Sequence, residues 1–499
     1  MLITSRRLRA ALLVTASATL VAAVLPGPEP LGIGDPLFPH LGNPGYDVLT
    51  YDIAFTYRGA NSRPLDAVTK IDARATKHLE RINLDFTSGT VRAVEVNGSS
   101  AEFTTAGEDL VITPRRAVDA GTPLAITVTH TSDPKGGEAG GWVRTTDGLA
   151  MANQADAAHR VFPCNDHPAD KAHFTFRITA PTGLTAVANG LPVPAARTGA
   201  AEPTAKSATR TWVYRTRHPM ATELAQVSIG KSAVVRREGP HGLPLRDVVP
   251  AAQRARLEPW LRKTPGHITW MENKVGRYPF ETYGVLLAQA ETGFALETQT
   301  LSLFETSMFT DARYPKWYVE SVMVHELAHQ WFGNSVTPRT WSDLWLNEGH
   351  ATWYGSLYAE EHAEQPLEEQ MREAYAQSDG WRAAGGPPAA PKPAAPGRQL
   401  GLFRPIVYEG SALVLYALRQ EIGKDAFETL ERAWVAEHRD GTATTADFTA
   451  LAQRVSGRDL TGFFRGWLYG EKTPRMPGHP DWRSEAPSAQ RNAAPAVKH

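Results

Sequence analysis

The sequence predicts two domains, an antiparallel β domain followed by a mostly helical one. Its 499 residues exceed the usual size of a single domain. From Tyr46 to about Val235, short stretches with alternating or β-branched residues predict strands, as in YDVLTYDIAFTY, VRAVEV and PLAITVTH. From about Pro250 the apolar spacing becomes helical, as in PAAQRARLEPWLRKTPGHITWMENKVG.

The N-terminus has the pattern of a secretory signal. Arg6, Arg7 and Arg9 precede an uncharged apolar run from Ala10 to Leu25, which is shorter than a membrane-spanning helix. We therefore expect a secreted, extracellular protein, with an uncleaved membrane anchor as the alternative. The predicted division is a signal peptide (1–30), a β domain (36–235), a second domain (236–474) and a disordered tail (475–499).

Composition excludes several classes of partner and site. The chain carries 52 Lys and Arg against 53 Asp and Glu, without a long block of like charge. We therefore expect no nucleic-acid partner and no binding to an anionic membrane surface. The single cysteine, Cys164, excludes internal disulfides and a thiolate zinc site. We expect it to be a buried apolar thiol.

One segment has the pattern of a metal-binding helix. The stretch PKWYVESVMVHELAHQWFG, from Pro315 to Gly333, has the apolar spacing of a buried helix over that range. His325 and His329 are four residues apart, so one helix turn brings both imidazoles to the same face, as two ligands of one zinc ion require. Glu326 is rotated by roughly 100° from His325, beside the metal rather than on it, where a general base belongs.

A third ligand is predicted on the next helix. Glu348 follows His329 after eighteen intervening residues, on a helix that we expect Ser342 or Asp343 to cap. Two histidines and one glutamate with an open fourth position form a catalytic zinc site, one per chain. The alternative is a pair of satisfied core histidines and a surface carboxylate. It would leave three polar groups inside an apolar helix pair without a compensating charge.

A site of this kind predicts hydrolysis. Zinc lowers the pKa of bound water toward neutrality, Glu326 takes the proton, and the resulting hydroxide attacks a carbonyl that the metal polarises. The expected reaction is cleavage of an amide or a similar bond.

With these motifs, the sequence resembles the aminopeptidase N and leukotriene hydrolase family of zinc peptidases. The motifs HELAHQWFGN and WSDLWLNEG carry the resemblance, together with FPCNDHPADKAHFTF, TTADFTALAQ and FFRGWLYG, over about Asp35 to Pro474. It implies a β-sandwich-like N-terminal domain and a thermolysin-like α+β catalytic domain. Many relatives carry a further large helical domain, whereas a short polar tail follows Gly470, so we expect no such domain here.

The resemblance also implies residues that bind substrate. ETGFALETQT corresponds to the family's G-x-M-E-N segment, which places Glu297 on the substrate's free α-amino group. Gln154 falls where relatives have glutamate, or glutamine in the leukotriene hydrolase branch, and implies a second amine contact. Tyr408 matches the tyrosine that stabilises the oxyanion, although Gly410 and Ser411 replace the basic residue and glycine that usually follow it.

We therefore expect a monomeric, exported zinc aminopeptidase that removes N-terminal residues from peptides with a free N-terminus. The altered amine-binding segment and Gln154 keep a second interpretation open, an endopeptidase or a hydrolase of non-peptide substrates. A third is a catalytically inert binding module that retains the fold. Such a module would normally have lost a metal ligand or the base, and all four residues are present.

Overall fold

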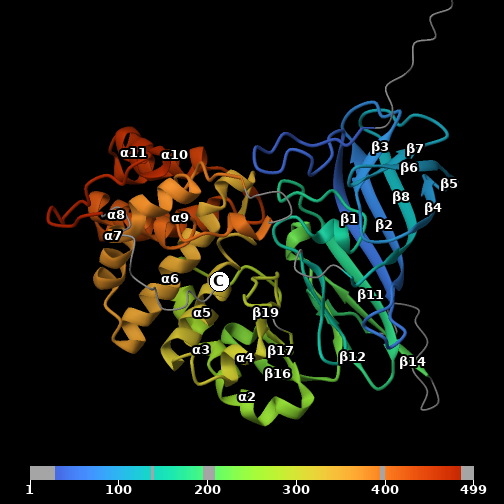
Figure 1. Cartoon of the computed structure of the whole chain (residues 1–499), viewed down its shortest axis with the longest axis horizontal. Coiled ribbons are helices and arrows are strands. Elements are labelled where there is room, and N and C mark those ends of the chain that lie inside the picture. Colours follow the sequence, from blue (N-terminus) through green and yellow to red (C-terminus); the bar gives the residue numbers. More distant parts are fainter. Residues whose placement is uncertain (1–28, 136–139, 195–207, 291, 394–398, 485–499) are drawn as a thin grey trace, which may run out of the picture.

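The N-terminal half is organised around one long sheet. The computed structural model describes residues 29–135, 140–194, 208–290, 292–393 and 399–484, so the predicted signal peptide lies almost entirely outside the described residues. The sheet contains β1 (Tyr46–Thr56), β2 (Leu65–Ala75), β4 (Val91–Val96), β5 (Ser99–Ser100), β8 (Pro123–Ser132), β11 (His173–Pro181), β13 (Leu191–Pro192) and β14 (Thr209–Arg215). Their order is β13-β14-β11-β1-β2-β8-β4-β5 (Figure 1).

The predicted antiparallel pairing needs one correction. β1 pairs in parallel with β11, in the register Thr50 to His173, while the other neighbours in this sheet pair antiparallel. The chain leaves the sheet after β8 and forms β9 and β10 of another sheet before it returns as β11. Because β1 and β11 are not joined by a hairpin, nothing requires them to be antiparallel.

Two smaller sheets complete the β domain. One has the order β3-β7-β6, from Ile82–Asp85, Asp109–Thr113 and Glu102–Ala106. The other has the order β12-β15-β10-β9, from Thr185–Ala188, Val227–Gly230, Leu149–Ala152 and Gly141–Arg144. In the β-domain core, the ring of Tyr51 stacks on that of Phe174, and the ring of Phe162 packs edge-on against both. Cys164 is also buried, as predicted, and burial raises the pKa of its thiol well above the usual range.

A four-stranded sheet lies between the two cores. Its order is β16-β17-β18-β19, from Ser232–Glu238, Pro244–Pro250, Val285–Ala288 and Ser302–Glu305, so the domain boundary predicted at residue 235 falls inside β16. Leu286 and Leu303 pack in the core of the β domain, whereas Leu287 and Phe304 pack in the helical core. Since alternate residues of a strand face opposite sides, this sheet contributes to both cores at once.

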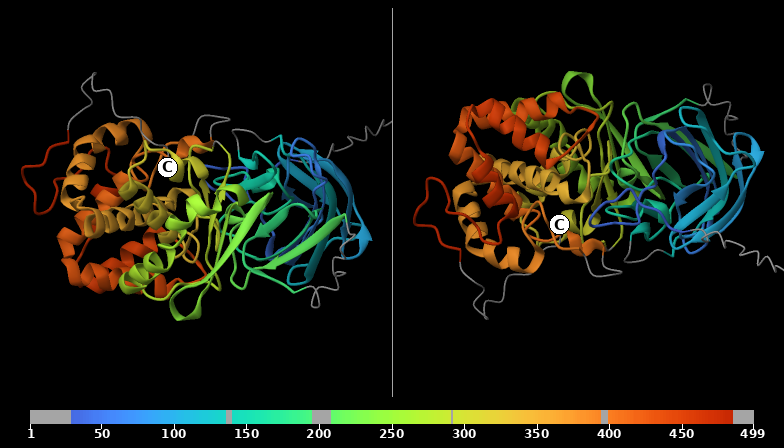
Figure 2. Two further views of the ribbon diagram at one scale, coloured as in Figure 1. Left: turned by 90° about the horizontal axis from the view of Figure 1, so that it is seen from below. Right: turned by 90° about the horizontal axis from the view of Figure 1, so that it is seen from above.

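Helices form the other half of the molecule, as the sequence predicts (Figures 1 and 2). They are α2 (Arg254–Leu261), α3 (Thr264–Val275), α4 (Thr306–Thr310), α5 (Lys316–Ala328), α6 (Trp345–Ala363), α7 (Leu367–Gly385), α8 (Glu409–Ile422), α9 (Lys424–Glu437), α10 (Thr445–Ser456) and α11 (Thr461–Tyr469). Helix α6 packs against α5, α7 and α8. Within the described ranges, no helix is long and apolar enough to cross a membrane.

The chain remains ordered beyond the predicted start of the tail at residue 475. Met476 and Trp482 are buried in the helical core. The Trp482 ring stacks on Tyr416 of α8, with the ring centroids 5.9 Å apart and the planes inclined by 5°. Apolar side chains in a proline-rich, polar segment were a weak sequence signal, but the aromatic surface of α8 gives them a partner. Residues 485–499 lie outside the described ranges.

Gly355 allows α5 and α6 to approach closely. A Cβ atom at this position would lie 3.0 Å from the Ser321 carbonyl oxygen and 3.5 Å from the Cβ atom of His325. A larger side chain would therefore push against the backbone of α5. The distance between these helices sets how closely the side chains of α5 and α6 approach one another.

We expect Gly355→Val to separate α5 from α6 and to lower the free energy of unfolding by about 1–3 kcal/mol, the usual cost of overpacking. Gly266→Val is the matched control, because Gly266 lies in α3 with nothing within 4 Å of its added Cβ atom. Urea denaturation of both variants measures the effect. Equal stability of the two would show that the helices do not depend on this contact.

Candidate metal centre

Three buried side chains from α5 and α6 converge. The Nε2 atoms of His325 and His329 lie 3.2 Å apart. Oε2 of Glu348 lies 3.4 Å from Nε2 of His325 and 3.3 Å from Nε2 of His329. The structure therefore brings together the two histidines of the HExxH motif and the glutamate that the sequence predicted on the next helix.

Helix α5 ends earlier than predicted. It runs from Lys316 to Ala328, with Pro315 as N-cap and His329 as C-cap, rather than continuing to Gly333. After Ala328 the main chain closes into tight turns, in which the amides of Gln330 and Trp331 bond to carbonyls three residues earlier. Nδ1 of His329 donates to the Phe332 carbonyl over 3.1 Å. This bond directs Nε2 toward Glu348.

The start of α6 also differs from the prediction. Neither Ser342 nor Asp343 caps it directly; Thr340 begins a short 3-10 helix, Trp341–Asp343, that leads into α6. Oδ2 of Asp343 accepts from the Thr340 amide and hydroxyl. Its Oδ1 accepts from the amide and hydroxyl of Thr445 at the start of α10. Asp343 thus links two helix starts and holds the first turn of α6, where Glu348 lies.

The three side chains fit a zinc ion. Two imidazoles and one carboxylate are a usual donor set for catalytic zinc, with one position left open. Among the described residues, Oε2 of Glu348 has no hydrogen-bond partner, although it is buried. Burial raises the pKa of Glu348, but His329 and His325 lower it further, to about 2. A buried carboxylate of this kind requires a nearby cation, which favours a metal over satisfied core histidines.

His350 illustrates the alternative arrangement on the same helix. Its Nδ1 donates to the Leu346 carbonyl over 2.6 Å, and its Nε2 lies 3.3 Å from Oε1 of Glu431. The other oxygen of Glu431 accepts from the hydroxyl of Tyr354. The polar atoms of this buried pair are satisfied within the protein, so it needs no ion.

Glu326 lies beside the donor set. Its carboxylate belongs to a group with Glu297 and His329 whose ligand atoms all lie within 4.8 Å of one another, and it is not part of the group formed by the three donors. Among the described residues, its Oε2 has no hydrogen-bond partner. Burial raises the pKa of Glu326 well above the usual range, and the charge of Glu297 acts in the same direction. A carboxylate with a raised pKa can take up a proton near neutral pH.

The two residues expected to hold an amine also meet. Nε2 of Gln154 donates to Oε1 of Glu297 over 2.6 Å, although the residues come from different domains. The same oxygen lies 4.0 Å from Nδ1 of His329. Burial raises the pKa of Glu297, while His329 and the bond from Gln154 oppose the change. The pair therefore places an acidic group directly beside the metal centre.

Sequence reasoning missed two side chains that hold Glu297. The amide groups of Gln330 and Asn334 donate to the Glu297 carbonyl over 3.0 and 2.7 Å. Oε1 of Gln330 also accepts from the Thr300 amide over 2.9 Å. Both residues belong to HELAHQWFGN. The sequence does contain a signal for them, because two side-chain amides follow the second histidine in an otherwise apolar segment. Buried amides are hydrogen-bonded, so each of these could be expected to hold another part of the chain.

Tyr408 lies at the start of α8 and faces the centre. Its ring centroid is 6.1 Å from that of His325, with the planes inclined by 30°. Burial raises the pKa of Tyr408 well above the usual range, and Glu348 adds to the effect, so the phenol keeps its proton. Packing favours glycine at position 410, two residues after Tyr408. A Cβ atom on Gly410 would lie 2.7 Å from a side-chain atom of Ile406.

Two family models match this chain, one in each domain. The Peptidase M1 N-terminal domain matches residues 49–224, and the Peptidase family M1 domain matches residues 261–467. This chain belongs to peptidase family M1. The predicted resemblance is thus confirmed, as is a β-rich domain followed by a catalytic domain of the M1 type.

Curated relatives within family M1 are similar over part of their length. Aminopeptidase N of Streptomyces lividans is 27% identical over 334 residues, covering 62% of this chain and 36% of the relative. Aminopeptidase M1 of Arabidopsis thaliana is 27% identical over 320 residues, covering 62% and 35%. The chain spans about a third of the length of these relatives.

Solved structures of M1 enzymes match over nearly their whole length. The M1 zinc metallopeptidase from Deinococcus radiodurans has a TM-score of 0.74 and 27% identity, covering 89% of this chain and 98% of that one. A point mutant of the same enzyme bound to a Tyr-Ser-Ala substrate has a TM-score of 0.74 and 26% identity, covering 90% and 100%.

We expect Glu348→Gln to weaken zinc binding by at least about 100-fold, more than the loss of an outer partner usually causes. The substitution keeps the shape of the side chain and removes its charge. Zinc content after dialysis against buffered free zinc measures the effect. Glu431→Gln is the matched control, because Glu431 is also a buried carboxylate beside a histidine of α6. The Glu431→Gln variant should keep its zinc. Equal zinc content in both variants would rule out Glu348 as a ligand.

Proposed function

We propose that this chain is an exported zinc aminopeptidase that removes N-terminal residues from peptides. One observation supports it most strongly: the buried carboxylate of Glu297, held by Gln154, lies 4.0 Å from a histidine of the three-donor cluster. An acidic group at that place can bind the ammonium group of a peptide. The peptide bond that follows the first residue would then lie at the metal centre.

In this proposal His325, His329 and Glu348 hold one zinc ion. When bound, zinc polarises the scissile carbonyl and makes water acidic enough to yield a nucleophile near neutral pH. Glu326 accepts the proton of the attacking water and returns it to the leaving amine. Burial and the charge of Glu297 raise the pKa of Glu326, which favours uptake of the proton by this carboxylate.

Tyr408 is proposed to stabilise the oxyanion. Its buried phenol keeps its proton, because burial and the neighbouring carboxylates raise its pKa. A protonated hydroxyl can donate to the negative charge that develops on the carbonyl oxygen. Such a donor contributes on the order of 3 kcal/mol in the transition state when it is aimed at that oxygen.

The amine site combines one charged and one neutral group. Glu297 supplies the negative charge, and Gln154 donates one N–H bond to it while its amide oxygen stays available to accept from the ammonium group. A neutral amide holds a cation less tightly than a second carboxylate would. This supports a second candidate, a hydrolase that acts on internal bonds or on non-peptide substrates.

Export, domain limits and oligomeric state complete the proposal. Residues 1–30 would act as the signal, a β domain would extend from residue 36 to β16, a catalytic domain would follow it to Trp482, and the mature enzyme would act as a secreted monomer. The arginines before an apolar run at the N-terminus support export.

We expect the zinc-loaded protein to cleave a short peptide with a free N-terminus and not its N-acetylated form, because acetylation removes the charge that Glu297 binds. A chelator should abolish the cleavage, and added zinc should restore it. Product analysis by liquid chromatography and mass spectrometry measures both. Equal cleavage of the two peptides would favour an endopeptidase, and cleavage of neither would favour a non-peptide substrate or an inert module.

We expect Glu326→Gln to lower kcat by about 10²–10⁴-fold, the usual contribution of general acid–base catalysis, while zinc content stays at the wild-type level. Glu320→Gln provides the control on the same helix, because Glu320 pairs with Lys263 rather than with the metal centre. That variant should keep kcat within about threefold of wild type. Full activity of Glu326→Gln would assign the base to another group.

A further inference from the structure

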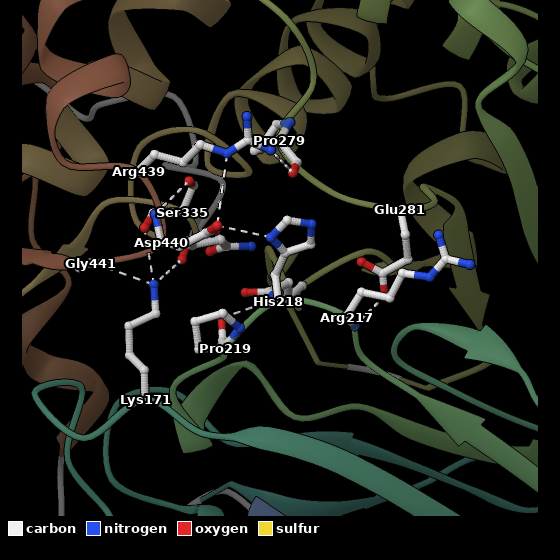
Figure 3. Close-up of polar contacts among 12 residues, drawn as sticks. Lys171, Arg217, His218, Pro219, Pro279, Glu281, Ser335, Arg439, Asp440 and Gly441 are labelled. Carbon is white, nitrogen blue, oxygen red and sulfur yellow. Dashed lines mark hydrogen bonds and ion pairs between the residues drawn. The ribbon is translucent and has the colours of Figure 1, made fainter. Parts of the chain in front are cut away.

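Lys171 of the β domain reaches the turn that follows the second histidine (Figure 3). Its Nζ atom donates to the carbonyls of Asn334 over 2.9 Å, Ser335 over 3.0 Å and Gly441 over 3.4 Å. Asn334 and Ser335 lie just after α5, and Gly441 lies just before β21 (Thr442–Ala443). One ammonium group therefore joins three main-chain carbonyls from two segments of the catalytic domain.

The same turn holds the proposed amine anchor. The Asn334 amide donates to the His329 carbonyl over 3.0 Å. The Asn334 side chain donates to the Glu297 carbonyl over 2.7 Å. Asn334 thus connects Lys171 to Glu297. Lys171 binds the main-chain carbonyl of Asn334, and the side chain of Asn334 binds the main-chain carbonyl of Glu297. A displacement of Asn334 would move the Glu297 carboxylate relative to the metal centre.

Neighbouring contacts fix the other border of the turn. Nδ1 of His218, also from the β domain, lies 2.9 Å from Oδ2 of Asp440. The Asp440 amide donates to the Ser335 hydroxyl over 3.3 Å. Arg439 donates to the Pro279 carbonyl over 2.7 Å. Figure 3 shows these side chains around the end of Lys171, so the turn is held between the β domain and the loop before β21.

The partners of Lys171 are unusual for a structural lysine. Within the described part of the chain, no carboxylate lies within ion-pair distance of its Nζ atom. Burial lowers the pKa of Lys171 to about 7, although Asp440 and Glu223 oppose this change. Burial of a cation that has only carbonyl partners costs free energy that an apolar side chain of the same length would avoid. The function of Lys171 must therefore lie in the three carbonyls that it binds.

We propose that Lys171 is a positioning residue for the amine anchor: by holding the carbonyl of Asn334, it sets the place of Glu297 relative to the metal centre. This inference rests on the proposed role of Glu297. The β domain would thus contribute twice to recognition of the N-terminus, directly through Gln154 and indirectly through Lys171.

Lys171→Met tests the proposal, because it keeps the length of the side chain and removes the donors. We expect KM for a free-amine peptide to rise by about tenfold or more, since small misplacements of a binding group have effects of this size, while kcat changes by less than about threefold. The zinc content should stay at the wild-type level. Lys171→Arg, which keeps charge and donors, should restore most of the affinity. If the Met variant does not fold, Lys171→Gln replaces it, with a smaller expected rise.

Arg382→Met is the matched control for stability. Arg382 is also a buried cation held by carbonyls, at 2.7 Å from both Trp467 and Gly470, but its partners belong to the C-terminal segment. A role in stability alone predicts that both variants lose thermal stability and that both keep the wild-type KM. That result would overturn the proposal, as would loss of zinc from Lys171→Met.

A binding measurement separates this inference from the proposed function. In the Glu326→Gln background, calorimetry gives the Kd of the same peptide with a free and with an acetylated N-terminus. We expect Lys171→Met to weaken binding of the free form by about tenfold and to leave the acetylated form unchanged. Equal Kd values with and without Lys171 would overturn the positioning role. A wild-type enzyme that binds the free form but cleaves nothing would instead contradict the proposed function.

Discussion

Three carboxylates share one buried volume in this protein, and segments of both domains hold them there. Glu297, Glu326 and Glu348 surround His329, and all are buried. Their mutual repulsion would favour dispersal unless a cation compensated for it. Two histidines supply part of the compensation, and a metal ion together with the ammonium group of a substrate would supply the rest. Gly355 and the link from Asp343 to α10 keep α5 and α6 close enough for this arrangement.

The two domains form one structural unit around this centre. The sheet β16–β19 packs one face in the β-domain core and the other in the helical core, so β17, β18 and β19 are mostly buried on both sides. Glu297 lies in the segment of the chain that connects β18 to β19. Its partners arrive from both directions, with Gln154 from the β domain and Asn334 from the turn after α5. In the proposed function, recognition of an amine would therefore depend on the contact between the domains, because each domain supplies part of the site.

Burial also gives the ionisable groups of the centre their different roles. Burial raises the pKa of Glu348, but the histidines lower it to about 2, so the carboxylate stays charged, as a metal ligand must. Glu326 is also buried; there burial raises the pKa well above the usual range, and the charges of Glu297 and Glu348 act in the same direction, which would suit it to proton transfer. The same surroundings keep the proton on Tyr408. Three acidic groups in one site thus obtain different pKa shifts from their burial and from the histidines and carboxylates around them.

The sequence by itself determined what depends on local spacing. His325 and His329 are one helix turn apart, so their common face follows from helix geometry, and alternation alone predicted the β domain. The family motifs added Glu297, Gln154 and Tyr408. The contact between Gln154 and Glu297 joins residues 143 positions apart, and no periodicity encodes such a distance. The end of α5 at Ala328, the parallel pairing of β1 with β11 and the reach of Lys171 were likewise decided only by tertiary structure, because each depends on which distant segment satisfies a backbone group.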